Sequence, residues 1–405
     1  MRDYDVVVVG GGPIGAVAAR IAAEAGARTL LVEKGDGSGE PARCAGLLSP
    51  RVLPTLGASD GSVIREIHGG VIHSPSGVEV SLHANAVKAI VIDRAVLNQE
   101  LVSLARDAGV KVRTHTRVTS VQPGSISLVA GGLHEDVSTG MIIGADGPRS
   151  LVASSFSLSP PEEMLIASQA TVIGAVRKSD EVDIFFGRSI APMFFAWAIP
   201  AQEGNTRVGL AAPLGTKTDE LLSRFLQSNK FGREVERIQG MIPISLAPEA
   251  VADGALLVGD AAGQVKPSSG GGLYTGGVCA RIAGKVAAEA ALAGKTAKND
   301  LVVYERRFNE EIGDELRFGR AARRLLSDVE DEAIDVIFRA INRPEVTELI
   351  ALHGDIDYPS RLVHAIASRR NLWPTLSPLI SILGGMDKLS RIAHAALASD
   401  SDAYV

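Results

Sequence analysis

The chain has 405 residues, of which 46% are hydrophobic and 22% are charged, and its formal net charge is −6 at pH 7. This length allows two or three domains with a large core, and the acidic balance argues against nucleic acid as a partner. The only cysteines are Cys44 and Cys279, so we expect no disulfide framework and a cytoplasmic location. No run of about 20 apolar residues predicts a membrane span, and the short apolar run near the N-terminus is typical of a buried strand, not of a signal peptide.

The first 35 residues predict a βαβ unit, with strands at 4–9 and 29–33 around a helix at 16–25. The first strand is followed by the three glycines of a G-x-G-x-x-G motif, which are Gly10, Gly12 and Gly15. The glycines permit a tight turn and close approach to a pyrophosphate, the helix N-terminus stabilises phosphate charge, and Glu33 can accept a ribose hydroxyl. The pattern therefore predicts dinucleotide binding. The alternative, a Gly-rich turn without a ligand, leaves Glu33 at a strand end unexplained.

Two later segments repeat the pattern of a strand followed by glycine and aspartate. The segment MIIGADGPRS (141–150) contains Asp146, and the segment 254–277 is a strand followed by Asp260 and a Gly-rich turn into a helix. Asp260 stands at the C-terminal end of its strand, where ligands of open α/β sheets bind. Backbone N–H groups of 268–272 at a helix start suit the anionic edge of a flavin ring. Because an NAD-only domain has no use for a second distant Gly-rich loop, the pattern favours FAD.

The segments GGGPIG, GADGPRS and GDAAGQVKPSSGGG resemble the FAD-dependent group that includes aromatic hydroxylases, flavin halogenases and geranylgeranyl reductases, over roughly residues 1–325. Two more segments resemble the archaeal-type geranylgeranyl reductase branch. PARCAGLLS (41–49) resembles the R-C-x-x-G-x-S segment that this branch places against the flavin and substrate cavity, with Gly46 one position early. FFAWAIPAQEGNTRVGLAAP (194–213) resembles an aromatic-x-W-x-F-P segment, with Phe195 in place of Tyr and Ile199 in place of Phe.

The motifs and the resemblance together assign FAD as the cofactor. The assigned cofactor-binding residues are Gly10, Gly12, Ile14, Gly15, Glu33, Arg43, Cys44, Gly46, Arg94, Val118, Asp146, Asp260, Gly271, Gly272 and Leu273. The assigned substrate-pocket residues are Phe195, Trp197, Ile199 and Pro200. The eight histidines show no ligand spacing, so no metal site is predicted.

The resemblance implies an α/β fold with three parts. We expect a Rossmann-type FAD-binding domain at 1–65, 93–155 and 251–300, an antiparallel-sheet substrate domain at 66–92 and 156–250, and a C-terminal helical region at 301–405. The substrate sheet is expected to roof the flavin ring.

The pattern also predicts single elements within these parts. A helix is predicted from Asp93, strands at 111–113 and 125–129, and helical structure from Ala280. Apolar residues at every fourth position predict a core-facing helical stripe that consists of Tyr304, Phe308, Ile312 and Leu316.

The function implied by the resemblance is reduction of isolated C=C bonds in prenyl chains, such as geranylgeranyl groups of ether lipids or prenylated quinones. The electron donor is NAD(P)H, ferredoxin or another reduced carrier. One alternative is a flavin monooxygenase or halogenase, because 195–200 reads F-x-W-x-I-P where halogenases carry W-x-W-x-I-P. Another is a non-catalytic prenyl-binding escort protein, against which the intact Glu33, Asp146 and Asp260 argue.

The role of Cys44 is open between two readings. Spacing alone favours a small buried hydrophobe, whereas the resemblance places the residue in the pocket, where the thiol can relay a proton. Arg43 could lower the pKa of that thiol or bind phosphate. Cys279 offers no C-x-x-C partner, so a dithiol redox role is not expected.

Two surface features have an ordinary and a less ordinary explanation. Arg317, Arg320 and Arg324 are expected to form a solvated face balanced by Glu310, Glu311 and Asp314, with binding of anionic lipid headgroups as the alternative. The segment 369–385 is expected to pack at the C-terminus, with a wedge at the membrane interface, and hence peripheral membrane contact, as the alternative.

Overall fold

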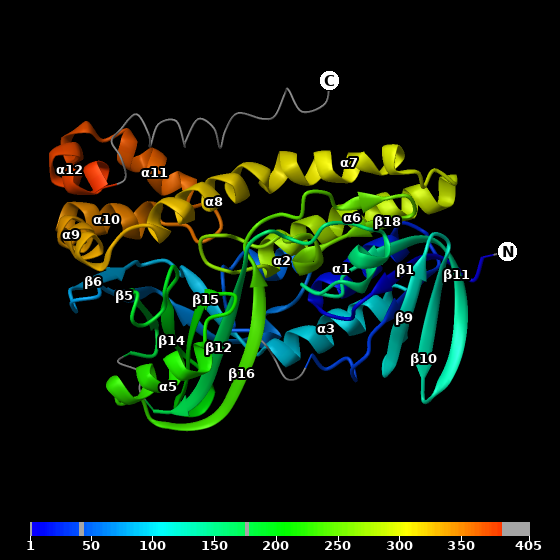
Figure 1. The fold of residues 1–405 in the computed structure, drawn as a ribbon, viewed down its shortest axis with the longest axis horizontal. Helices are drawn as coiled ribbons and strands as arrows, with labels where there is room; N and C mark the ends of the chain where they lie inside the picture. Colours follow the sequence, from blue (N-terminus) through cyan, green and yellow to red (C-terminus); the bar gives the residue numbers. More distant parts are fainter. Residues whose placement is uncertain (1, 40–43, 175–177, 383–405) are drawn as a thin grey trace.

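The computed structural model describes residues 2–39, 44–174 and 178–382. Within them, an eight-stranded sheet, a seven-stranded sheet and a three-stranded sheet are followed by a helical C-terminal region (Figure 1). The α/β fold class is therefore confirmed. Arg43 lies outside the described residues.

The eight-stranded sheet is mainly parallel at its centre. Its main path runs β17 (Val251–Ala252), β18 (Ala255–Leu257), β11 (Leu133–Gly144), β1 (Tyr4–Val9), β2 (Thr29–Val32) and β8 (Lys111–Arg113), and β10 (Ser125–Ala130) and β9 (Thr116–Gln122) extend β11 as an antiparallel meander. Val6, Val7 and Val8 are fully buried, as a strand covered on both faces requires.

Helices pack against this sheet. They are α1 (Pro13–Glu24), α3 (Arg94–Asp107), α4 (Leu151–Ser155) and α6 (Leu273–Ala293). The predicted helix at Asp93 is confirmed, since the Asp93 carboxylate caps α3 by accepting the N–H groups of Ala95 and Val96. Helix α1 begins three residues earlier than predicted, because Pro13 at its first position is compatible with the first helical turn.

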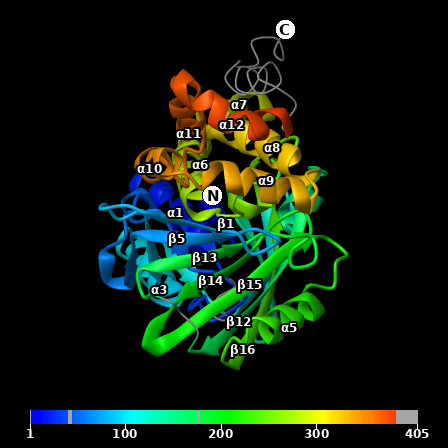
Figure 2. The same cartoon turned by 90° about the vertical axis from the view of Figure 1, so that its left-hand side faces the viewer.

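The seven-stranded sheet forms the second layer (Figure 2). Its order is β16 (Arg233–Pro243), β12 (Met164–Ile173), β15 (Asn205–Pro213), β14 (Ala196–Pro200), β13 (Glu181–Phe185), β5 (Gly69–His73) and β6 (Glu79–His83), with α5 (Thr218–Ser228) on one face. The expectation of an antiparallel sheet is wrong at one position, where β13 pairs with β5 in parallel. The two strands come from distant parts of the chain, so no hairpin imposes an antiparallel pairing.

The three-stranded sheet joins the two larger layers. It contains β3 (Leu47–Leu48), β7 (Ala89–Ile92) and β4 (Val63–Ile67), and the short helix α2 (Val52–Leu56) follows β3. Strand β7 therefore pairs with the segment that follows Cys44 instead of with the seven-stranded sheet.

The C-terminal helices run along one side of both layers (Figure 1). They are α7 (Lys298–Phe308), a π-helical turn (Asn309–Gly313), α8 (Asp314–Ser327), α9 (Asp331–Ile341), α10 (Pro344–His353), α11 (Ser360–Ala367) and α12 (Trp373–Ile382). The predicted stripe of Tyr304, Phe308, Ile312 and Leu316 is confirmed, because all four side chains are buried. In the described part of the chain, no helix is both long enough and apolar enough to cross a membrane.

The arginines of α8 are not merely a solvated face. Arg320 and Arg324 bond to Glu163, which precedes β12, and Arg320 also reaches Glu162. Only Arg317 pairs on its own helix, with Asp314 at 2.5 Å. The expected balance with Glu310 and Glu311 is therefore wrong for Arg320 and Arg324, because a tertiary contact places other carboxylates within reach.

Candidate functional site

The predicted dinucleotide residues meet at one edge of the eight-stranded sheet. Val9 is in register with Val32 and with Gly144, and Gly144 is in register with Leu257. The turns that follow these strands carry Gly10, Glu33, Asp146 and Asp260. Parallel strands end at the same edge, where open α/β sheets bind ligands.

The Gly-rich turn after β1 leaves room for an anion. Gly10 has a φ of 106°, and a Cβ on Gly15 would lie 1.9 Å from the Gly10 carbonyl oxygen, so both positions require glycine. A Cβ on Gly12 would meet nothing within 4 Å, and no side chain caps the N-terminus of α1. Backbone N–H groups at this helix start remain available for a pyrophosphate.

Ile14 links the first turn to the later Gly-rich loop. Its side chain lies 3.0 Å from the Cβ positions of both Gly259 and Gly276. Glycine at these positions lets the third turn and α6 approach α1.

Glu33 is held by backbone donors. Its carboxylate accepts the N–H of Gly11 at 2.6 Å and that of Gly35 at 2.7 Å. The carboxylate therefore fastens the first turn to the end of β2. Val118 lies on β9, whose first residue, Thr116, donates its N–H to the Glu33 carbonyl.

Asp146 caps the helix that follows it. Its carboxylate accepts the Ser150 hydroxyl at 2.6 Å and the N–H groups of Leu151 and Val152 at 2.7 and 3.2 Å. This geometry orients the 144–150 turn beside the site.

Arg94 lies within electrostatic reach of both Cys44 and Asp260. Its Nη1 is buried without a hydrogen-bond partner among the described residues. Desolvation lowers the pKa of Arg94, and desolvation, partly opposed by Arg94, raises the pKa of Asp260 to about 6. Asp260 Oδ1 lies 3.3 Å from the Cβ position of Gly272, so the aspartate faces the start of α6.

The turn that carries Asp260 is held by a buried network. The Gln264 side chain accepts the Gly259 N–H at 2.8 Å and donates to the Tyr304 hydroxyl at 2.7 Å, which donates to the Leu257 carbonyl at 2.9 Å. Thr275 at the start of α6 donates its hydroxyl to the Gln264 carbonyl at 2.5 Å. Residues from four segments therefore hold the turn and the helix start in one geometry.

The Cys44 segment is fastened to the seven-stranded sheet. Arg207 on β15 donates from Nη1 to the carbonyls of Ala45 and Ile92, both at 3.1 Å. A Cβ on Gly46 would lie 2.0 Å from that nitrogen, and Gly46 has a φ of 76°, so only glycine suits this position. The Cys44 side chain is half-buried, and its sulfur accepts the Gly46 N–H at 3.3 Å.

Gln169 on β12 connects Cys44 to the aromatic segment. Its side chain donates to the Cys44 carbonyl at 3.4 Å and accepts from Trp197 Nε1 at 3.0 Å. The Trp197 ring lies against Gly209, where a Cβ would be 2.5 Å from the ring. The indole is therefore held by its polar end and by its face.

An apolar cluster surrounds this tryptophan. Phe195 meets Trp197 edge-on at 6.2 Å and stacks on Phe194 at 4.2 Å, and Ile199 is 2% exposed. The cluster includes Ala45 and Leu47 from the Cys44 segment, and Pro200 closes β14 as a buried residue. The Cβ position of Gly270 lies 3.7 Å from Phe194 Cζ, so the Gly-rich loop borders the cluster.

Comparisons with known proteins agree with this geometry. Residues 3–219 match the family model described as an FAD binding domain. A protein of Methanothermobacter thermautotrophicus named digeranylgeranylglycerophospholipid reductase 2 is 32% identical over 89% of this chain and 98% of its own length. The chain belongs to the digeranylgeranylglycerophospholipid reductase family.

Further relatives of this reductase family extend the comparison. Digeranylgeranylglycerophospholipid reductase 1 of Methanopyrus kandleri is 34% identical over 87% of this chain and 99% of its own length. A geranylgeranyl bacteriochlorophyll reductase-like structure from Thermoplasma acidophilum is 25% identical, with a TM-score of 0.80 over 93% of this chain and 99% of that one. A flavin-dependent brominase shares the fold, with a TM-score of 0.68, 17% identity and coverage of 90% and 98%.

The cofactor of this reductase-family chain is FAD, and the chain is an FAD-dependent oxidoreductase. The orphaned Arg94 nitrogen and the turn at Gly10 and Gly15 fit such a group, because the first lacks an acceptor and the second leaves backbone donors free. The residues that we assign to hold it are the glycines after β1, Glu33, Arg94, Asp260 and the loop of Gly271, Gly272 and Leu273. These contacts remain predictions.

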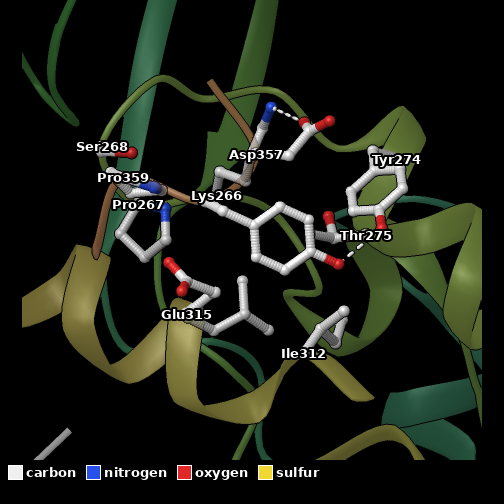
Figure 3. Close-up of a pocket in the computed structure, with 11 residues that line it drawn as sticks. Lys266, Pro267, Ser268, Tyr274, Thr275, Ile312, Glu315, Asp357 and Pro359 are labelled. Atoms are coloured by element: carbon white, nitrogen blue, oxygen red, sulfur yellow. Dashed lines mark hydrogen bonds and ion pairs between the residues drawn. The ribbon is translucent and has the colours of Figure 1, made fainter. Parts of the chain in front are cut away.

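A pocket lies beside the flavin loop of this reductase-family chain, between α8 and the segment that follows α10 (Figure 3). Lys266 and Pro267 border it from the loop, Tyr274 from the start of α6, Glu315 from α8, and Asp357 from the C-terminal region. None of the predicted site residues lines it.

Sequence reasoning missed the residues that hold the site together. Arg207, Gln169, Gln264, Lys266 and Asp357 were not singled out, although each is polar and contacts a predicted segment. The signal for Arg207 was a cation within an otherwise apolar strand pattern, 205–213. Asp357 offered no comparable signal, because the hydrogen-bond partners of its carboxylate lie at least 91 positions away.

Proposed function

We propose that this protein uses FAD to saturate isolated C=C bonds in the geranylgeranyl chains of a glycerophospholipid. The observation that carries the proposal is the single apolar cluster formed by the Cys44 segment and the Phe194–Pro200 segment beside the flavin loop. Apolar side chains of this kind suit contact with a prenyl chain and exclude water. The relatives named as lipid reductases support the same substrate class.

Reduced FAD, when bound, supplies the hydride for one alkene carbon. The other carbon needs a proton, and an isolated alkene has no carbonyl to polarise it. The Cys44 thiol is a half-buried donor at the edge of the apolar cluster, and Arg94 stands within electrostatic reach of it. We therefore assign to Cys44 the delivery of this proton, and to Arg94 the stabilisation of the thiolate that remains until solvent reprotonates it.

The test is anaerobic turnover with a defined lipid. Protein with chemically reduced FAD and a geranylgeranylated glycerophospholipid should give products that gain one H₂ per saturated bond by mass spectrometry, without oxygen uptake. Stoichiometric oxygen uptake with a hydroxylated or halogenated product would instead assign a monooxygenase or halogenase. Lipid binding without any product would assign an escort protein.

The physiological electron donor and the site of lipid uptake are part of the proposal. We infer that a reduced carrier, NAD(P)H or ferredoxin, reduces the flavin, and that the protein meets its substrate by peripheral contact with a membrane. Flavin bleaching on addition of each carrier identifies the donor. Cosedimentation with vesicles of anionic and neutral lipids tests the contact, and absence from both pellets would contradict it.

A further inference from the structure

A buried ion pair lies beside the flavin loop. Lys266 Nζ is 2.6 Å from Asp357 Oδ1, and the two side chains are 10% and 0% exposed. The Ser49 hydroxyl donates to the other Asp357 oxygen, and Arg51 Nη1 stands 3.7 Å from it. Asp357 therefore connects the flavin loop, the segment after Cys44 and the C-terminal region.

Neighbouring contacts hold this junction in place. The Tyr274 hydroxyl shares a hydrogen bond of 2.7 Å with the Tyr358 hydroxyl (Figure 3). Arg51 pairs with Asp355 at 2.8 Å. Burying two charges costs free energy that their mutual attraction often fails to offset. Stability alone therefore does not account for a buried ion pair between distant segments.

The Lys266 ammonium lies against the backbone of the flavin loop. A Cβ on Gly271 would be 3.1 Å from Lys266 Cε and 3.5 Å from Nζ. Lys266 also donates its N–H to the Gly271 carbonyl at 3.1 Å and accepts the Gly270 N–H at 2.9 Å. The loop that we assign to the edge of the flavin ring thus has a cation directly beside it.

We propose that the Lys266–Asp357 pair sets the redox potential of the flavin: the Lys266 ammonium stabilises the negative charge that the ring gains on two-electron reduction, and Asp357 positions that ammonium and moderates its charge. The proposal rests on the FAD site of the proposed function. It needs no reactant beyond FAD and its reductant, because the pair acts only through its field. Asp357 acts on the flavin through Lys266, so it is a positioning residue and not a catalytic one.

The experiment measures the affinities of each variant for oxidised FAD and for chemically reduced FAD, whose ratio reports the change in potential. Lys266→Gln should lower the preference for reduced FAD roughly tenfold, because the cation is lost near the ring. Asp357→Asn should raise it, because the cation loses its counter-charge. The double variant should fall between the two.

A matched control is the exposed pair of Lys298 and Glu249, which lies 2.7 Å apart with side chains 42% and 53% exposed. Lys298→Gln and Glu249→Gln should leave the affinity ratio unchanged. Lys266→Arg, which keeps the charge, should stay near the wild-type ratio. Asp357→Asn, with its expected rise in the ratio, still tests the proposal if Lys266→Gln fails to fold.

The outcome that would overturn the proposal is an unchanged ratio, or a shift of the same sign, in Lys266→Gln and Asp357→Asn. Either result would make the pair a structural contact only. The readout needs no prenyl substrate, so failure of lipid reduction would count against the proposed function and leave this inference standing.

Discussion

The two cysteines show how strongly local surroundings determine the reactivity of a thiol. Cys44 is half-buried and lies within reach of Arg94, whereas Cys279 is fully buried in α6. Desolvation raises the pKa of the Cys279 thiol well above its usual value, so that residue is an inert core thiol. Of the two, only Cys44 is placed to serve chemistry.

Replacement of Cys44 separates proton delivery from packing. If the thiol protonates the alkene, Cys44→Ser should retain FAD and slow lipid reduction by roughly 10- to 10,000-fold. Stopped-flow reoxidation of the flavin by lipid measures this step, and Cys279→Ser is the control for a cysteine without contact to the site. A core role predicts instead a loss of about 1–3 kcal/mol in the free energy of unfolding with normal reoxidation, which would contradict the assignment.

Asp260 predicts a pH dependence of stability in the FAD-free protein. Burial raises the pKa of its carboxyl from 3.8 to about 6, so between these values the folded state binds more protons than the unfolded state. The contribution of Asp260 to stability is therefore fully present below about pH 4 and is lost as the pH rises through 6. The loss should reach up to about 2–3 kcal/mol, discounted for the partial exposure of the side chain.

Urea unfolding of wild type and Asp260→Asn across pH 4–8 checks this expectation. The difference between the two free energies of unfolding should change over that window, because Asn cannot ionise. Parallel curves at all pH values would show that Asp260 does not titrate with a raised pKa.

At the scale of elements, a charged joint connects α8 to the seven-stranded sheet. Glu163 precedes β12 and accepts from Arg320, Arg323 and Arg324 at distances from 2.5 to 3.3 Å. Desolvation raises the pKa of Glu163, but hydrogen bonds from Arg324 and Arg320 outweigh it and keep that pKa below its usual value. The joint therefore stabilises the docking of α8 only while Glu163 is ionised.

Neutralising that carboxylate should loosen the joint. Glu163→Gln should lower the free energy of unfolding by about 1–3 kcal/mol, because three guanidinium groups lose their common acceptor. Chemical denaturation measures the change. Glu162→Gln is the matched control, since Glu162 is 65% exposed and should cost less than about 1 kcal/mol. Equal effects of the two variants would show that the joint adds nothing beyond a surface ion pair.

At the scale of the whole molecule, the C-terminal helices form a small core of their own. Leu376 is fully buried against a cluster that includes Val346, Leu349 and Leu372. This burial supports the packing explanation of the segment that begins at Arg369, of which residues 383–385 lie outside the described residues.

Truncation of Leu376 distinguishes packing from membrane insertion. Leu376→Ala should cost about 2–5 kcal/mol of stability in the C-terminal region and leave vesicle binding unchanged. Leu352→Ala, at a residue 69% exposed, should cost little. Normal stability with lost vesicle binding would identify the segment as a membrane wedge.

The sequence by itself determined the βαβ unit, the helix from Asp93 and the buried helical stripe, because each depends on local periodicity and on glycine positions. It also placed Gly10, Glu33, Asp146 and Asp260 after strands, and parallel pairing brings strand ends to one edge. The family motifs likewise predicted FAD as the cofactor.

Only the tertiary structure decided the contacts that join these segments. The parallel pairing of β13 with β5, the bond of Arg207 to Ala45 in the Cys44 segment and the ion pair of Lys266 with Asp357 link residues 91 or more positions apart. Such pairings have no local periodicity, and their partners are chosen by packing of whole layers. The acidic partners of Arg320 and Arg324 were missed for the same reason, because ion pairing depends on distance in space and not on spacing along the chain.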